Sequence, residues 1–179
     1  MSKTIIFGIS ASIAAYRSYD LIRDLTKENM TVIPVLSQDA HHFISPLVLQ
    51  SLSSQTVYQS FFDPAINQKP IHTELAKIAD LIVVSPASAD IIAKIRIGLA
   101  NDLLTCTLLA ARSPILLVPA MNDHMYNNPA TQENLEVLRM RGLRILDPIE
   151  GDLVCEDKAI GHIADNESIK EQILDLLNA

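Results

Sequence analysis

The stretch that decides the fold is TIIFGISAS, residues 4–12. It begins with an apolar run, as in a buried strand, and continues into a turn that carries Gly8, Ser10 and Ser12. The next residues, 13–27, repeat apolar side chains at helical spacing, and Ser12 is well placed to cap that helix. In doubly wound α/β proteins such a turn faces a nucleotide phosphate. Because the dinucleotide fingerprint GxGxxG is missing, the turn favours a monophosphate.

The same alternation of buried strand and helix continues along the chain. Further strands are expected at 31–37, where Pro34 is a weak point, 80–86, 114–120 and 143–148. Helices are expected at 40–52 with a break at Pro46, 72–79, 88–111 with an interruption near Gly98, 121–141 and 168–177, and a loop over 148–165. Strands separated by helices predict a parallel sheet with both faces covered. We therefore expect one α/β domain over 1–179, a doubly wound, Rossmann-like or flavodoxin-like three-layer sandwich.

Composition narrows the classes of function. The net charge of −7 argues against nucleic acid as the main partner, so local features such as helix N-termini must hold any anionic ligand. The hydrophobic share of 49% predicts a large core or a surface buried against further copies of the chain. Two cysteines make no disulfide framework, which favours a reducing cytoplasm. No apolar run is long enough to span a membrane.

Small and hydroxylic residues recur where the predicted strands end, which is where open α/β sheets bind ligands. The residues that follow the predicted strands are Gly8, Ser10, Ser12, Ser37, Ser85, Ala87, Ser88, Asp90, Ala120, Met121 and Asn122, and most of them are small or hydroxylic. Such residues let backbone N–H groups approach a phosphate, and their hydroxyls donate without formal charge. The pattern predicts a mononucleotide site, although the first two serines also suit simple caps.

Three residues, His72, Asn122 and Cys155, are candidates for chemistry. His72 begins a helix and suits a proton shuttle at neutral pH, or a surface cap. Asn122 follows a strand and suits an N-cap, or an amide donor to a substrate carboxylate. Cys155 lies in a polar loop, where a thiol has reason to react, whereas Cys106 lies in an apolar helix and suits an inert side chain. No residue spacing suggests zinc, so no metal site is expected.

Taken in order, five stretches resemble the homo-oligomeric flavin-containing cysteine decarboxylases, from about residue 3 to residue 165. They are GISASIAAYRS (8–18), IHTELAKIADLIVVSPASAD (71–90), GLANDLLT (98–105), PAMNDHMYNNPATQENLEVLRMRG (119–142) and the late Gly-x-Leu-x-Cys loop (151–155). The resemblance implies FMN bound without a covalent link, and a homotrimer, sometimes built into a dodecamer, with its active site at the trimer contact. It assigns the FMN contacts to Gly8, Ile9, Ser10, Ser37, Ser88, Ala89, Asp90 and Ala120.

The resemblance also implies a reaction and roles for the remaining candidates. His72 matches the family's essential histidine, and Asn122 binds the substrate carboxylate with Met121 and Met125 beside it. Cys155 matches the cysteine of the substrate clamp. The best-matching members act on 4′-phosphopantothenoyl-L-cysteine in coenzyme A synthesis, and bacterial ones are often fused to the ligase that adds the cysteine. The chain is thus expected to be a free-standing decarboxylase or a piece of such a fusion.

The sequence departs from the family pattern in two places, and the first of them keeps an alternative open. After Cys155 the usual glycine-rich run ending in Gly-Arg-Met reads EDKAIGHI, in which Gly161 alone remains and His162 stands where arginine is typical. Asp90 stands where other members have asparagine, a variant that is compatible with FMN. The first alternative is a peptidyl-cysteine decarboxylase of the same family. Others are a flavin prenyltransferase, which His72 and the PAMN motif argue against, and a non-catalytic flavoprotein binding subunit.

Overall fold

The central sheet consists of five parallel strands in the order β2-β1-β3-β4-β5. The computed structural model describes residues 2–62, 70–153 and 156–179. The strands are β1 (Thr4–Ile9), β2 (Thr31–Leu36), β3 (Leu81–Ala87), β4 (Ile115–Pro119) and the short β5 (Arg144–Ile145). This is the flavodoxin-like strand order. It confirms the predicted doubly wound sheet.

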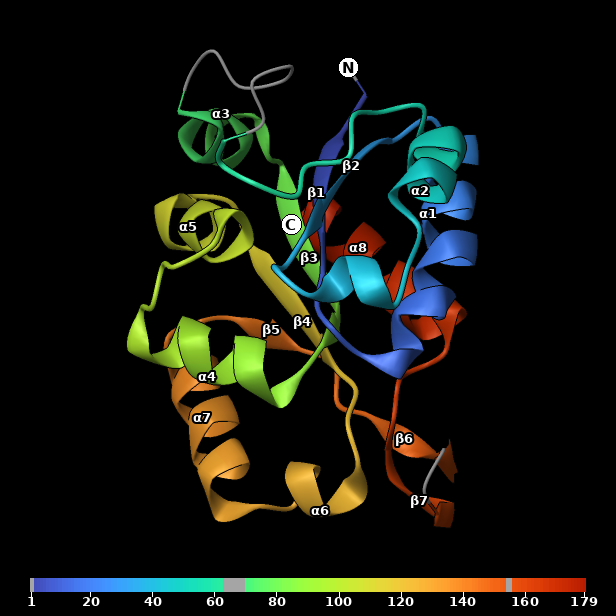
Figure 1. Ribbon diagram of the computed structural model, residues 1–179, viewed down its shortest axis with the longest axis vertical. Coiled ribbons are helices and arrows are strands. Elements are labelled where there is room, and N and C mark those ends of the chain that lie inside the picture. The colour runs from blue at the N-terminus through green and yellow to red at the C-terminus, as the bar shows by residue number, and fades with distance from the viewer. Residues whose placement is uncertain (1, 63–69, 154–155) are drawn as a thin grey trace.

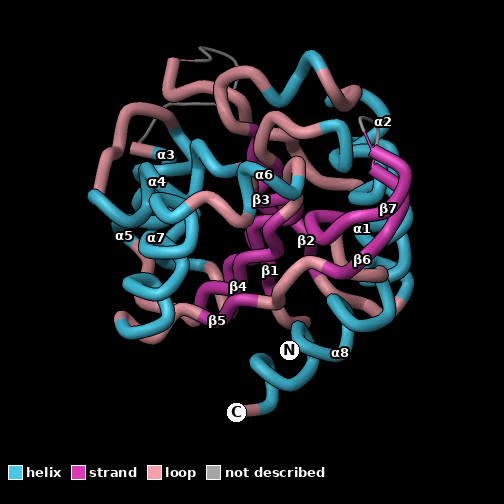
Figure 2. The backbone as a smooth tube through the Cα atoms, turned by 90° about the horizontal axis from the view of Figure 1, so that it is seen from below, coloured by secondary structure: helices cyan, strands magenta, loops and turns pink. Residues whose placement is uncertain are grey.

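Helices cover both faces of the sheet and make the predicted three layers (Figures 1 and 2). On one face lie α1 (Ser18–Lys27), α2 (Pro46–Ser53) and α8 (Asn166–Asn178). On the other lie α3 (Ile71–Ile78), α4 (Ala89–Ile97), α5 (Leu103–Ala110) and α7 (Pro129–Met140). Shorter turns of helix are η1 (Ile13–Arg17), η2 (Ala40–His42) and α6 (Asp123–Tyr126).

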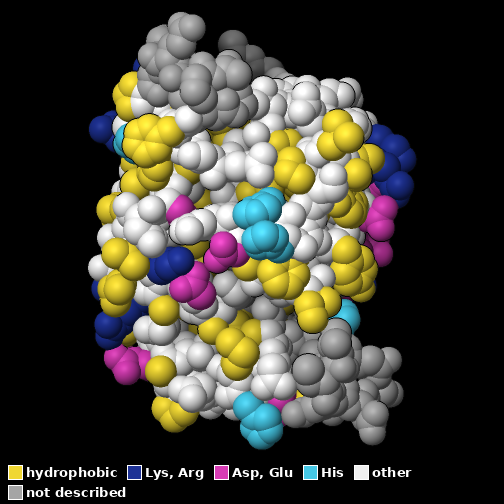
Figure 3. All heavy atoms as spheres, in the orientation of Figure 1, with side chains coloured by type: hydrophobic (Ala, Val, Ile, Leu, Met, Phe, Trp, Pro, Cys, Tyr) yellow, Lys and Arg dark blue, Asp and Glu magenta, His cyan; other side chains and the backbone are white. Residues whose placement is uncertain are grey.

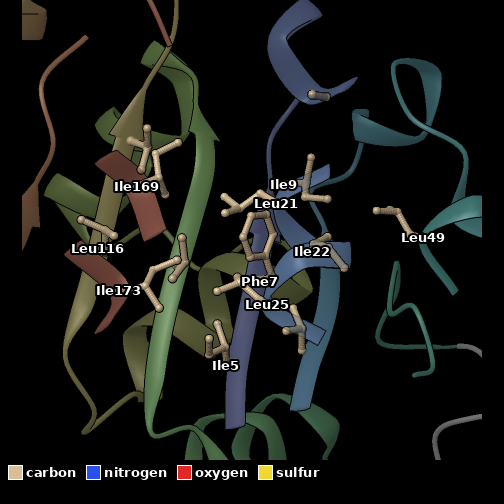
Figure 4. Packing of buried hydrophobic residues seen from close by; sticks show 14 of the residues in the cluster. Ile5, Phe7, Ile9, Leu21, Ile22, Leu25, Leu49, Leu116, Ile169 and Ile173 are labelled. Atoms are coloured by element: carbon tan, nitrogen blue, oxygen red, sulfur yellow. The ribbon is translucent and has the colours of Figure 1, made fainter. Parts of the chain in front are cut away.

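Alternate residues of β1 explain why the chain needs helices on both sides. Ile5 and Phe7 point into the cluster formed with α1 and α8, where Phe7 lies against Leu21 and Leu25 (Figure 4). Ile6, between them, belongs to the cluster on the opposite face. Since neighbouring side chains of a strand point to opposite faces, an unbroken apolar strand is stable only with both faces covered.

Pro46 and Gly98 interrupt the helices as expected, whereas Pro34 does not interrupt its strand. Pro46 is the first residue of α2, and Gly98 ends α4 in the left-handed region at φ +72°. Pro34 lies within β2, which is an edge strand. Its carbonyl accepts from the Tyr58 N–H on the outer side, at 3.0 Å, so the missing proline N–H removes no bond to β1.

The expected loop over 148–165 is wrong. This stretch forms an antiparallel hairpin of β6 (Ile149–Leu153) and β7 (Glu156–His162), separate from the main sheet. The sequence hides it because charged residues cluster there without the apolar alternation of a half-buried strand. Gly151 allows the pairing, since a Cβ at this position would lie 2.7 Å from Cγ of His162.

Gly8 allows β1 to pack closely on α5. A Cβ at this position would lie 2.7 Å from Cδ1 of Leu104 and 3.3 Å from Cγ2 of Val84. We expect Gly8→Ala to lower the free energy of unfolding by about 1–3 kcal/mol in urea denaturation, as for other overpacked cores. Adding Leu104→Val should make the double variant less unstable than the sum of the singles. Plain additivity would contradict this account of Gly8.

Asp165 caps α8, and this contribution depends on pH. Its carboxylate accepts from the Ser168 N–H and hydroxyl, at 2.8 Å each, and these bonds hold the pKa of Asp165 below its ordinary value of 3.8. A lowered folded-state pKa stabilises the fold above the unfolded-state pKa, and the effect is lost as pH falls through the folded-state pKa. Asp165→Ala should therefore cost about 1 kcal/mol at pH 7, and this cost should shrink as the pH falls through the lowered pKa of Asp165. Asp175→Ala, further along α8, should show no such cost in the same denaturation series.

Candidate active site

A cavity of about 420 Å³ lies where β1, β3 and β4 end. Ser12, Ser88 and Asn122 line it, each just after one of these strands, and His162 of β7 lines it from the hairpin. Figure 1 shows α6 and the β6–β7 hairpin at this end of the molecule. Both the size and the place are those of small-molecule sites in open α/β folds.

Two serines present the starts of helices to this cavity. The Ser88 hydroxyl accepts from the Ile91 N–H at 3.4 Å and caps α4, and the Ser12 hydroxyl accepts from the Ala14 N–H at 3.3 Å and caps η1. Ala89, the first residue of α4, also lines the cavity. The N-terminus of a helix carries partial positive charge and free N–H groups, so this wall suits an anion.

Ser10 serves to position Ser88. The buried Ser10 hydroxyl donates to the Pro86 carbonyl at 2.8 Å and accepts from the Ser88 N–H at 2.9 Å. It thereby ties the end of β1 to the end of β3. In the protein without ligand this serine therefore has a structural role, whereas the family resemblance implies that it contacts the cofactor.

Several expected FMN contacts do not line the cavity of the single chain. Ile9 is buried in the core, the Ser37 N–H donates to the Ile9 carbonyl at 3.0 Å, and Asp90 pairs with Lys94 at 2.7 Å. Gly8 and Ser10 are also absent from the residues that line the cavity. The residues that form it instead are Ala11, Ser12, Ile13 and Ala14. The sequence did carry a signal for these lining residues, namely the helical spacing that starts after Ser12. The start of a helix lies nearer a bound ligand than the strand before it.

Asn122 caps a helix and also lines the cavity. Its Oδ1 accepts from the His124 N–H at 3.0 Å and so caps α6. That bond uses the oxygen and leaves the amide NH₂ to donate to a ligand. Ala120, Met121 and Met125 of the same segment also line the cavity.

The short helix that carries Asn122 is held firmly. The hydroxyl of the buried Tyr126 donates to Oδ1 of Asp147 at 2.9 Å, and the Gln132 amide donates to the Tyr126 carbonyl at 2.6 Å. Burial and the neighbouring Asp147 carboxylate raise the pKa of Tyr126 above its ordinary value, so the hydroxyl remains a donor. Asn122 therefore meets the cavity from a fixed backbone.

The hairpin is pressed against the end of β4 at Gly161. The Met121 N–H donates to the Gly161 carbonyl at 3.1 Å, and φ of Gly161 is +137°. A Cβ on Gly161 would lie 2.2 Å from the Met121 carbonyl oxygen. His162, the next residue, donates from Nδ1 to the Ile163 carbonyl at 2.8 Å. Only glycine at 161 permits this close approach, which brings His162 to the cavity.

His72 lies apart from the cavity of its own chain. It is on α3, which Figure 1 shows at the opposite end of the molecule from α6. Its ring meets Phe61 edge-on at 5.7 Å, and its buried Nδ1 has no hydrogen-bond partner within the described ranges. Cys155 lies outside the described residues. Burial and the Asp102 charge raise the pKa of the Cys106 thiol, which suits the inert role expected of it.

The comparison with family models decides where the chain belongs. The model described as Flavoprotein matches residues 1–178. The chain is a member of the Flavoprotein family. Within the ranges described above, no helix of this flavoprotein has the length and apolar character needed to cross a bilayer.

Similar proteins match more than nine-tenths of this flavoprotein. The Coenzyme A biosynthesis bifunctional protein CoaBC of Haemophilus influenzae is 43% identical over 176 residues, which are 98% of this chain and 44% of that one. CoaBC of Escherichia coli is 43% identical over 163 residues, which are 91% of this chain and 40% of that one. The flavoprotein thus spans less than half the length of these curated relatives.

Solved structures show the same fold. A mutant PPC decarboxylase complexed with pantothenoylaminoethenethiol superimposes with a TM-score of 0.91 and 29% identity, over 100% of both chains. The FMN-binding protein AtHal3 superimposes with a TM-score of 0.86 and 30% identity, over 97% of this chain and 96% of that one.

Proposed function

We propose that this flavoprotein binds FMN and acts as a carboxy-lyase on 4′-phosphopantothenoyl-L-cysteine, giving 4′-phosphopantetheine in coenzyme A biosynthesis. One observation carries the proposal: an anion-binding helix start at Ser88 and the amide of Asn122 line the same cavity. That pairing suits a phosphorylated cofactor beside a carboxylate substrate. The CoaBC relatives and the PPC decarboxylase structure support the choice of substrate.

The residues present fit FMN. Ser12, Ser88 and Ala89 offer hydroxyls and a helix start to its phosphate, and Ala120 and Met121 offer small or apolar surface to its ring. When bound, FMN supplies the electron sink that an amino-acid carboxylate lacks, by accepting a hydride equivalent from the cysteine CH₂–SH group and later returning it. The ligand named in the PPC decarboxylase structure is an enethiol, the kind of compound that such an oxidative decarboxylation produces.

The chain's own residues bind, orient and protonate. The Asn122 amide donates to the substrate carboxylate and fixes the bond that breaks. Met121 and Met125 contact the cysteine portion, and the β6–β7 hairpin excludes water. His72 moves the proton between the substrate and solvent, and Cys155 supplies the proton that completes the product.

We further propose that a second copy of the chain brings His72 to the cavity. The support is that His72 does not line its own chain's cavity and that its Nδ1 is buried without a described partner. Large apolar side chains such as Leu47, Ile97 and Leu109 are exposed, and Figure 3 shows hydrophobic side chains on both sides of the face it displays. A homotrimer, alone or within a dodecamer, would cover such surfaces. We also propose that the protein works in the cytoplasm, together with a phosphopantothenate–cysteine ligase that is either fused to it or separate.

Mixed oligomers test the shared site. His72→Gln and Asn122→Asp should each lose about 99% of the activity or more, because each removes one half of every site. Co-expressed in equal amounts, they should recover about a quarter of wild-type activity, since a site is intact when one subunit supplies Asn122 and its neighbour His72. Carbon dioxide release from the purified mixture measures this. A mixture as inactive as the single variants would place both residues in one subunit's site.

The reaction itself is tested with the purified protein and an absorption spectrum. A flavin band near about 450 nm and anaerobic release of carbon dioxide from 4′-phosphopantothenoyl-L-cysteine are expected. A colourless protein after FMN reconstitution would overturn the proposal. The altered run Glu156–Ile163 favours one second candidate, a peptidyl-cysteine decarboxylase, which would release carbon dioxide from a peptide ending in cysteine instead. Bound flavin with no reaction on either substrate would indicate the non-catalytic binding subunit.

A further inference from the structure

The charges on the cavity wall differ from those of the chain as a whole. The chain carries 21 acidic and 14 basic residues, yet no acidic side chain is among the described residues that line the cavity. Two lining residues can carry positive charge, Arg17 and His162. A negatively charged protein therefore keeps one concave site free of carboxylates, which favours an anionic ligand there.

Arg17 is available to bind that ligand. Arg23, Arg96 and Arg139 each pair with a carboxylate. The Arg17 guanidinium, in contrast, has no hydrogen-bond or ion-pair partner among the described residues, although its backbone carbonyl accepts from the Asn166 amide at 3.4 Å. A guanidinium offers a planar set of donors that matches a phosphate group.

His162 lies on the same cavity wall in a fixed orientation. Its Nδ1 donates to the Ile163 carbonyl at 2.8 Å, which leaves Nε2 as the ring atom free to meet a ligand. The ring lies directly across from Gly151, where any side chain would displace it. With a hydrogen on each ring nitrogen, the imidazole donates from Nε2 to an anion in the cavity.

We propose that Arg17 and His162 form a subsite for a phosphate monoester. The inference rests on the proposed function, since both FMN and 4′-phosphopantothenoyl-L-cysteine carry such a group. Asn122 is then left for the carboxylate, and the two ends of the substrate are recognised by different chemistry: an amide for the carboxylate, and cations for the phosphate. The subsite makes the protein select phosphorylated ligands over the same ligands without phosphate.

Binding measurements test the subsite without relying on turnover. The apoprotein is titrated with FMN and with riboflavin, followed by flavin fluorescence, and the FMN-loaded protein with 4′-phosphopantetheine and with pantetheine, followed by calorimetry. Arg17→Gln should weaken binding of one phosphorylated probe by about 10- to 100-fold, the scale of one charge-assisted hydrogen bond, and change binding of its unphosphorylated counterpart less than about twofold. Arg17→Lys should bind the phosphorylated probe with an affinity between those of the wild-type protein and Arg17→Gln. His162→Gln should weaken binding of that probe by about 3- to 10-fold.

Matched controls separate a local effect from general damage. Arg23→Gln removes an arginine from the adjoining helix α1, away from the cavity. His41→Gln removes a histidine whose Nδ1 also meets a backbone carbonyl, that of Gln38 at 3.0 Å, but which does not line the cavity. Neither should alter the preference for phosphate.

The outcomes distinguish the source of the phosphate and the failure of each idea. Weaker binding confined to FMN assigns the subsite to the cofactor, and weaker binding confined to 4′-phosphopantetheine assigns it to the substrate. An unchanged preference for both phosphorylated probes in Arg17→Gln and His162→Gln would overturn the subsite. If the wild-type protein bound no FMN and released no carbon dioxide, the proposed function would fail instead.

Discussion

Asn122→Asp should lower kcat/KM for decarboxylation by about 100- to 1,000-fold while leaving the fold intact. The substitution exchanges an amide donor for a carboxylate, which repels the substrate carboxylate and removes its hydrogen bond. Removing a charge-assisted hydrogen bond inside a buried site should reduce transition-state stabilisation by about 3–4 kcal/mol. Steady-state carbon dioxide release from the FMN-loaded protein measures it.

The same variant keeps the cap of α6, which makes the test specific. An aspartate at 122 accepts from the His124 N–H as asparagine does, so the free energy of unfolding should hardly change. Asn128→Asp is the matched control, because the Asn128 Oδ1 caps α7 through the Ala130 N–H at 2.9 Å, away from the cavity. Equal activity in the two variants would show that Asn122 is a cap and nothing more.

Gly161→Ala should have the second large effect, on stability and on ligand binding together. At φ +137° an alanine is strained, and its Cβ would lie 2.2 Å from the Met121 carbonyl oxygen, which belongs to rigid backbone. Either β7 or the start of α6 must move. We expect a loss of more than about 2–3 kcal/mol in unfolding free energy and at least about tenfold weaker FMN binding.

Gly142→Ala separates backbone strain from the clash. Gly142 also has a positive φ, +88°, but nothing lies within 4 Å of a Cβ built there. It should cost about 1–2 kcal/mol through strain alone and leave FMN binding unchanged. If Gly161→Ala and Gly142→Ala behaved alike in both measurements, the packing of β7 on Met121 would not support the site.

The sheet was predictable because its signal is local. Apolar strands such as Leu81–Ala87 alternate with amphipathic helices, and that alternation allows few arrangements besides a parallel sheet covered on both faces. The hairpin of β6 and β7 was missed for the opposite reason. Its strands are charged, and what holds them is a pairing between residues up to 13 apart together with the hydrogen bond between Gly161 and Met121.

Positions of candidate residues were predictable only where a helix start marks them. Ser88 and Asn122 follow apolar strands and cap helices, and both line the cavity. Gly8 and Ser10 are of the residue types that are typical of a phosphate-binding turn. The contacts that the structure shows for them are with residues far along the chain, Leu104 for the glycine and Pro86 for the serine.

By itself the amino-acid sequence determined the α/β architecture, the end of the sheet at which the site lies and the family it resembles, because each depends on periodicity or on motifs of adjacent residues. Only the tertiary structure decided which small residues form the wall, that His162 joins Arg17 on it, and that His72 lies elsewhere. These three features depend on contacts between segments that lie far apart in the chain. Packing and hydrogen bonding between those segments set the side-chain positions, and local sequence patterns do not encode such contacts.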